Sequence, residues 1–123
     1  MSLPLICRNS KAVKQNWKPG TLVYPLPAVL VGCGADPSEW NVLTVAWTGT
    51  LCTDPAMCYI SVRKERYSYD LIRRTGEFTI NLTTRSMARA TDWCGVRSGR
   101  DNDKFARTGL TPIPCTVVKA PAI

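Results

Sequence analysis

Residues 41–51 read NVLTVAWTGTL and contain the clearest alternation in the chain. Large apolar side chains alternate with small or hydroxylated ones along it, so that Leu43, Val45, Trp47 and Leu51 share one face and Thr44, Ala46, Thr48 and Thr50 share the other. A period of two residues predicts a single β-strand here. We expect the bulky face, with Trp47, to be buried. The small face leaves the backbone open either to a flat ligand or to another layer of the same protein.

The segments on both sides of this stretch are also short and mostly strand-like. We expect an edge strand broken by Pro25 and Pro27, then strands at 28–33, 57–63, 77–82 and 113–119. Helices are predicted at about 69–75, with Ser68 as the N-cap and Gly76 after the last turn, and at about 85–94, with a polar loop over 96–109. This pattern predicts a mainly β or α+β fold, a β-barrel with inserted helices.

Length and composition limit the kinds of protein this chain can be. Its 123 residues suit one domain, which we place at 21–123 after an N-terminal arm at 1–20, and its 45% apolar content is that of a folded protein. The sequence contains no histidine. Its absence removes the commonest general base and the His-based metal sites, so we expect no metal. Chemistry must come from a cofactor or from carboxylates, thiols, hydroxyls and the backbone.

The cysteines and the apolar runs indicate the compartment. None of the six cysteines has CxxC spacing, and the opening segment lacks the pattern of a secretory signal. No apolar run reaches the roughly 18 residues of a membrane helix. We therefore expect reduced thiols, a cytoplasmic location and no membrane partner.

The net charge of +7 lies almost entirely in the second half, where residues 62–123 hold twelve Lys/Arg against six Asp/Glu. The densest group, Arg63, Lys64 and Arg66, runs through Tyr67 to Ser68 at the start of a predicted helix. Arginine forks, a hydroxyl and free helix amides together suit a phosphate, although an ordinary capped helix with solvated charges has the same sequence.

A second candidate segment follows the other predicted helix, at residues 92–105. Cys94 ends that helix, Ser98 and Gly99 can present a hydroxyl and a backbone amide, and Lys104 adds a mobile charge. A plain surface loop is the alternative, but long irregular loops in compact domains are often binding loops.

Read together, these segments resemble a known family. The ordered set consists of Asn41 to Gly49, Ser61-Val62-Arg63, Arg66-Tyr67-Ser68, Leu71-Ile72, Thr75 to Leu82, Cys94-Gly95, Ser98-Gly99, Asp103-Lys104-Phe105 and Gly109-Leu110-Thr111. It resembles, over about residues 19–123, the flavin reductase family with an FMN-binding split barrel, especially its flavoredoxin-like branch. The resemblance implies a six-stranded Greek-key split barrel that forms a homodimer with FMN near the subunit interface. Family members continue beyond a segment like 120–123, so we expect a barrel that is truncated at its C-terminus.

The resemblance also implies which residues contact FMN. The strand residues Thr44, Val45, Ala46, Trp47 and Thr48 would lie beside the isoalloxazine ring. The phosphate and ribityl chain would be held by Ser61, Arg63, Arg66, Tyr67 and Ser68, and a loop would bring in Cys94, Ser98, Gly99 and Lys104.

Three functions fit these observations. The first is a flavin reductase or other NAD(P)H-dependent oxidoreductase, in which the flavin carries out the redox chemistry. The second is a flavoredoxin-type electron carrier with a protein electron donor, or an FMN-binding module without pyridine-nucleotide activity. The chain has no GxGxxG motif, which argues against a separate Rossmann domain, although a nicotinamide stacked on the flavin needs none. The third, a basic nucleic-acid-binding barrel, needs exposed aromatic side chains on a strand face, and we expect Trp47 to be buried.

Overall fold

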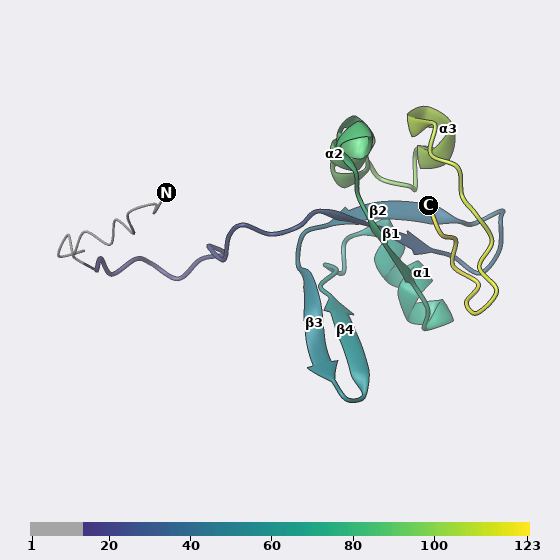
Figure 1. The fold of residues 1–123 in the computed structure, drawn as a ribbon. Helices are drawn as coiled ribbons and strands as arrows, with labels where there is room; N and C mark the ends of the chain where they lie inside the picture. Colours follow the sequence, from purple (N-terminus) through teal and green to yellow (C-terminus); the bar gives the residue numbers. More distant parts are fainter. Residues whose placement is uncertain (1–13) are drawn as a thin grey trace, which may run out of the picture.

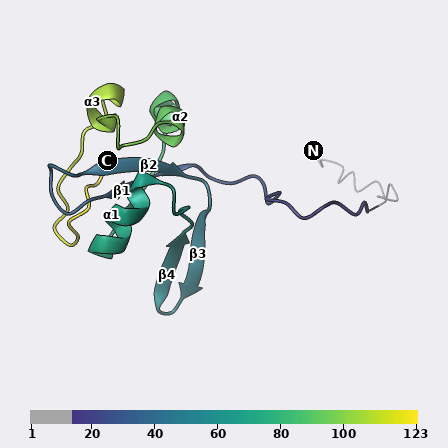
Figure 2. The same cartoon turned by 180° about the vertical axis from the view of Figure 1, so that it is seen from behind.

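The computed structural model describes residues 14–123 (Figures 1 and 2). Its elements in chain order are β1 (Val29–Cys33), β2 (Asn41–Val45), β3 (Thr48–Thr53), β4 (Ala56–Ile60), α1 (Tyr67–Thr75), β5 (Thr79–Leu82), the short 3₁₀ helix η1 (Arg85–Met87), α2 (Ala88–Val96) and α3 (Lys104–Thr108). Of the expected N-terminal arm, residues 1–13 lie outside the described part of the chain, and residues 14–27 form neither helix nor strand.

The centre of the fold is an antiparallel three-stranded sheet in the order β2-β1-β5. Val31 in β1 stands opposite Leu43 in β2 and Ile80 in β5. Because β1 is paired on both edges and covered on both faces, all five of its residues are buried. Strands β3 and β4 form a separate two-stranded sheet, which projects away from the rest as a hairpin (Figure 1).

Helices cover both faces of the central sheet, α1 on one side and α2 and α3 on the other (Figures 1 and 2). The alternation within the strands explains this arrangement. Val31 and Leu43 point to the side where Ile72 of α1 packs, while Leu30 packs on the opposite side with Cys94 of α2. Each fully buried aliphatic side chain contributes about 1.5–3 kcal/mol, so these two clusters fix the layers.

Helix α1 differs from prediction at its start and matches it at its end. It begins at Tyr67 with Arg66 as the N-cap residue, and no side chain caps it. The expectation that Ser68 caps the helix is therefore wrong. Ser68 lies in the first turn, where Asn41 Nδ2 donates a hydrogen bond to the Ser68 hydroxyl oxygen at 2.7 Å. At the other end, Gly76 adopts φ 69°, and its N–H donates to the Ile72 carbonyl, as expected of a glycine after the last turn.

The single strand predicted at 41–51 is wrong, because the structure divides it into β2 and β3. The chain turns at Ala46 and Trp47, and the N–H of Ser61 donates to the Trp47 carbonyl at 2.8 Å. From there β3 leaves the central sheet to pair with β4. Trp47 consequently stands at the base of the projecting hairpin and is 42% exposed, which corrects the expectation that it is buried.

Other boundaries also shift within the described residues. No strand forms over 21–27, the strand predicted over 57–63 ends at Ile60, and helix α2 continues through Gly95 to Val96. The predicted polar loop at 96–109 contains α3, whose N-cap Asp103 accepts a hydrogen bond from the Ala106 amide at 3.0 Å. A capping carboxylate nucleates this short helix.

The strand predicted at 113–119 is also absent, and a single bridge between Ile113 and Ala122 replaces it. The chain between the two bridge residues is a coil whose end lies across β1 and β5, with Pro121 fully buried. Gly32 makes room for it, since a Cβ at that position would come within 2.1 Å of the Pro121 carbonyl oxygen. The amide of Ile123 donates to Asn81 Oδ1 at 3.0 Å. Position 32 must therefore be glycine, because any side chain there would occupy the space of Pro121.

Candidate functional site

Two adjoining cavities lie between β2, the start of α1 and the loop that follows α2. The first has a volume of about 300 Å³ and is lined by Leu43, Thr44, Val45, Ala46, Trp47, Ser61, Val62, Arg63 and Arg66. The second has a volume of about 100 Å³ and is lined by Leu43, Thr44, Glu65, Arg66, Tyr67, Ser68, Cys94, Gly95, Arg97, Ser98, Gly99 and Lys104. They share Leu43, Thr44 and Arg66, so one elongated ligand could occupy both.

The first cavity is a hollow beside the end of β2. Its lining includes Val45, Ala46 and Trp47, and Trp47 is partly exposed. Thr44 is fixed beneath it, because its hydroxyl donates to the Thr91 carbonyl in α2. Gly95 allows α2 to approach closely, since a Cβ there would lie 3.4 Å from Thr44 Cβ. A rigid strand end with small side chains can seat a flat ring and offer it backbone hydrogen bonds.

The second cavity collects positive charge at a helix N-terminus. The first amides of α1 have no acceptor within the helix, and the helix dipole places partial positive charge at the same point. Arg66, the N-cap residue, reaches across to α2, where its Nη1 donates to the Gly95 carbonyl at 3.2 Å. Arg97 and Lys104 also line this cavity, against one carboxylate from Glu65. Such a set of donors suits an anion.

Lys104 is the most unusual group of the site. Only 4% of it is exposed, and its Nζ donates to the Cys94 carbonyl at 2.8 Å. The one ion pair among the described residues joins Arg74 and Glu39, so no carboxylate balances this buried ammonium. Burial lowers the pKa of Lys104 below its usual value, since a desolvated cation is unfavourable. An anion in the second cavity would remove that penalty, and this donor set therefore fits a phosphate group.

Burial also shifts the pKa of the two thiols near Lys104, but in the upward direction. Burial raises the pKa of Cys94, and the nearby Lys104 charge only partly offsets this effect. The pKa of Cys33 is also raised, again mainly by burial. A nucleophilic cysteine needs a lowered pKa, so neither thiol is prepared for covalent catalysis. The five cysteines in the described part of the chain are free, and Cys7 lies outside it.

The structure brings together nearly all the residues proposed from sequence. Every one of them lines one of the two cavities except Thr48, which lies in β3 and donates its hydroxyl to the Tyr59 carbonyl at 2.7 Å. Sequence reasoning did not select five lining residues, namely Leu43, Val62, Glu65, Gly95 and Arg97. It also passed over Asn41, which holds Ser68 from behind. An asparagine at the head of an otherwise apolar predicted strand was the available signal.

Residues 14–123 contain neither a cluster of metal-ligating side chains nor a helix that could span a membrane. No three or more Cys, Asp or Glu side chains gather as metal ligands there. Likewise, no helix in that range has both the length and the apolar character needed to cross a bilayer.

Comparison with known proteins identifies the family. Residues 21–123 match the family described as the flavin reductase like domain, and the chain belongs to that family. Its fold is the split barrel of these proteins, mainly β with a few helices, and the described residues form the open sheets of such a barrel.

Among solved structures, the chain resembles flavoredoxin of Desulfovibrio vulgaris (Miyazaki F), with 40% identity and a TM-score of 0.82 over 89% of this chain and 60% of that one. It also resembles flavoredoxin from Methanosarcina acetivorans, with 26% identity and a TM-score of 0.74 over 89% of this chain and 59% of the other. An uncharacterised protein from Pyrococcus abyssi is 31% identical over 83% of this chain and 58% of its own length. The chain thus spans less than two thirds of these relatives.

Proposed function

We propose that the chain binds FMN across the two cavities, with the isoalloxazine ring in the first and the phosphate in the second. The buried, unpaired ammonium of Lys104 carries this proposal, because it sits in a cavity that opens beside a small-residue strand end. The two cavity volumes, about 300 Å³ and about 100 Å³, agree with this assignment. The larger cavity is lined by Thr44 to Trp47, where the ring would lie, and the smaller one has room for a compact anion.

Each part of the site has a separate task in this arrangement. Thr44, Val45, Ala46 and Trp47 orient the ring at the strand end. Arg66, Lys104 and the first amides of α1, in which Tyr67 and Ser68 lie, would hold the phosphate. Ser61 and Arg63 line the first cavity, within reach of the ribityl chain, and Ser98 and Gly99 close the second one.

The reaction we propose is flavin-dependent oxidoreduction. FMN, when bound, supplies the capacity to accept and pass on electrons singly or in pairs. The protein side chains fix the position of the flavin and exclude water from one face of it. Flavin reductase activity with NAD(P)H is the first candidate, supported by the family match over residues 21–123.

Electron transfer without pyridine nucleotide is the second candidate. The 40% identity to flavoredoxin of Desulfovibrio vulgaris favours it, and the donor would then be a protein. Trp47 and Tyr59 are both partly exposed, so, contrary to the expectation from the sequence, burial of the aromatic side chains does not exclude a nucleic-acid partner. The exposed hairpin, residues 48–60, nevertheless contains no Lys or Arg to pair with phosphates, and so we do not propose that partner.

A second copy of the chain is the partner we propose. The β3–β4 hairpin projects from the body with Leu51, Met57 and Tyr59 exposed (Figure 2). An isolated two-stranded hairpin is marginally stable in water, and its open edges invite pairing. Because Trp47 lies at the base of this hairpin and lines the first cavity, a homodimer formed there would also cover the ring of FMN.

The deciding experiment is a flavin titration of the purified protein followed by addition of NADH or NADPH. We expect quenching of FMN fluorescence to saturate near one FMN per chain. Bleaching of the bound flavin by NADH or NADPH under anaerobic conditions supports the reductase, and bleaching only by a protein or chemical reductant supports the electron carrier. Failure to bind FMN at micromolar concentration contradicts both.

A further inference from the structure

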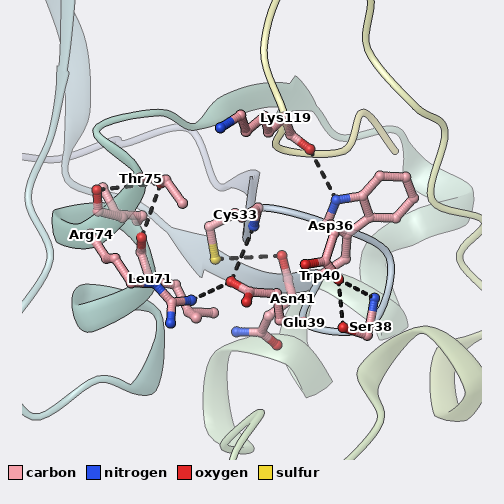
Figure 3. A network of polar contacts seen from close by, with 12 residues as sticks. Cys33, Asp36, Ser38, Glu39, Trp40, Asn41, Leu71, Arg74, Thr75 and Lys119 are labelled. Atoms are coloured by element: carbon pink, nitrogen blue, oxygen red, sulfur yellow. Dashed lines mark hydrogen bonds and ion pairs between the residues drawn. The ribbon is translucent and has the colours of Figure 1, made fainter.

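Asn41 does not line the second cavity but contacts Ser68, which does. It is the first residue of β2 and is 5% exposed. Its Nδ2 donates to Ser68 Oγ at 2.7 Å, a buried contact that joins residues 27 positions apart. Its backbone is also held, because the Cys33 thiol donates to the Asn41 carbonyl at 3.6 Å (Figure 3). Asn41 is thus a fixed donor aimed at one hydroxyl of the site.

The direction of this hydrogen bond decides what the Ser68 hydroxyl can do. A serine hydroxyl has one proton to donate and two lone pairs to accept with. Asn41 occupies a lone pair, so the proton stays available. The Cys33 thiol also lies beside Ser68, and sulfur is a weak acceptor. A phosphate oxygen is a far stronger acceptor, so the proton would turn into the cavity when a phosphate is bound.

We propose that Asn41 is a positioning residue that orients the Ser68 hydroxyl as a donor to the flavin phosphate. The inference rests on the proposed binding of FMN. It assigns to Asn41 a part in distinguishing FMN from riboflavin, which lacks the phosphate.

Gly99 supplies an independent observation for the same arrangement. A Cβ at Gly99 would stand 2.3 Å from Asn41 Oδ1 and 2.9 Å from Nδ2, so only glycine leaves the amide in its place. The φ of Gly99 does not lie in the left-handed region, so the requirement for glycine here comes from space. The loop after α2 is therefore shaped around the Asn41 side chain.

The test compares dissociation constants for FMN and riboflavin in single and double variants. Ser68→Ala removes the donor, and Asn41→Leu removes its orienting partner at similar volume. Each should weaken FMN by about ten- to a hundredfold, the range for a hydrogen bond to a charged group, and leave riboflavin within about twofold. Asn41→Leu should add nothing to the FMN-to-riboflavin ratio in the Ser68→Ala background, because both act through one hydroxyl.

Thr75→Val is the matched control, since it removes a hydroxyl from the other end of α1, where Thr75 donates to the Leu71 carbonyl at 3.0 Å. It should leave the ratio unchanged. Gly99→Ala displaces the Asn41 side chain from another side and should reproduce the effect of Asn41→Leu. This second variant keeps the test decisive if Asn41→Leu does not fold. Unchanged ratios in Ser68→Ala and Gly99→Ala, or additive effects in the double variant, overturn the inference. Wild-type protein that binds neither flavin overturns the proposed function itself.

Discussion

Replacing Lys104 by methionine tests the anion site most directly. Methionine keeps most of the aliphatic stem and removes the ammonium, which is 4% exposed and unpaired by any carboxylate. A charged hydrogen bond to a phosphate contributes about 1.5–3 kcal/mol, and at this depth solvent screens it little. We therefore expect Lys104→Met to weaken FMN binding by about tenfold to 150-fold.

The same change should leave the stability of the apoprotein nearly constant. The hydrogen bond from Nζ to the Cys94 carbonyl, at 2.8 Å, is lost, which costs about 1 kcal/mol. The unfavourable burial of an unpaired cation, which lowers the pKa of Lys104, disappears as well. These effects have opposite signs, so the free energy of unfolding should change by less than about 1 kcal/mol.

The assay is fluorescence titration with FMN and with riboflavin, paired with urea unfolding of the apoprotein. Lys64→Met is the control, because Lys64 is exposed, carries the same charge and lines neither cavity. It should weaken FMN less than threefold. Equal weakening of FMN and riboflavin in Lys104→Met, or a loss of stability of several kcal/mol, would refute the assignment of Lys104 to the phosphate.

Four further predictions concern neighbouring groups and assembly. Arg66→Ala should weaken FMN by about ten- to a hundredfold and leave riboflavin almost unchanged, whereas Arg74→Ala, at the far end of α1, should leave both affinities unchanged in the same titration. The pKa of Lys104 is lowered in the free protein, and a bound phosphate would raise it, so FMN binding should take up a proton between the two pKa values. FMN affinity should accordingly fall as the pH rises through that window, and a pH-independent ratio of FMN to riboflavin affinity would contradict this. Cys94→Ala should retain flavin binding and any electron-transfer rate within about threefold, because burial raises the pKa of that thiol and keeps it protonated, and stopped-flow reduction kinetics would show otherwise. Sedimentation should find a dimer, and a flavin-saturated monomer would disprove the proposed role of the β3–β4 hairpin.

The alternation and turn signals in the sequence located β1, β2 and β5 and the end of α1. Period-two alternation located β2 and β5, and an apolar β-branched run located β1, because each strand needs an apolar side to pack. Gly76 marked the end of α1, because the residue after a helix often adopts a left-handed conformation, here with φ 69°, which glycine reaches most easily. The order of short motifs was enough to suggest the family, and most of the residues that line the two cavities lie in those motifs.

Contacts between distant segments decided the rest. No periodicity shows that Lys104 is buried, because its burial comes from α2 packing over β2 and from the Cys94 carbonyl, which accepts a hydrogen bond from its ammonium. The exposure of Trp47 follows from the departure of β3 toward β4, a choice of pairing partner that alternation alone does not specify. The role of Asn41 depends on Ser68, 27 positions away, and on a loop glycine that leaves room for its amide. Sequence patterns report the preferences of the local backbone, whereas burial and hydrogen-bond direction are set by side chains that meet only after the chain has folded.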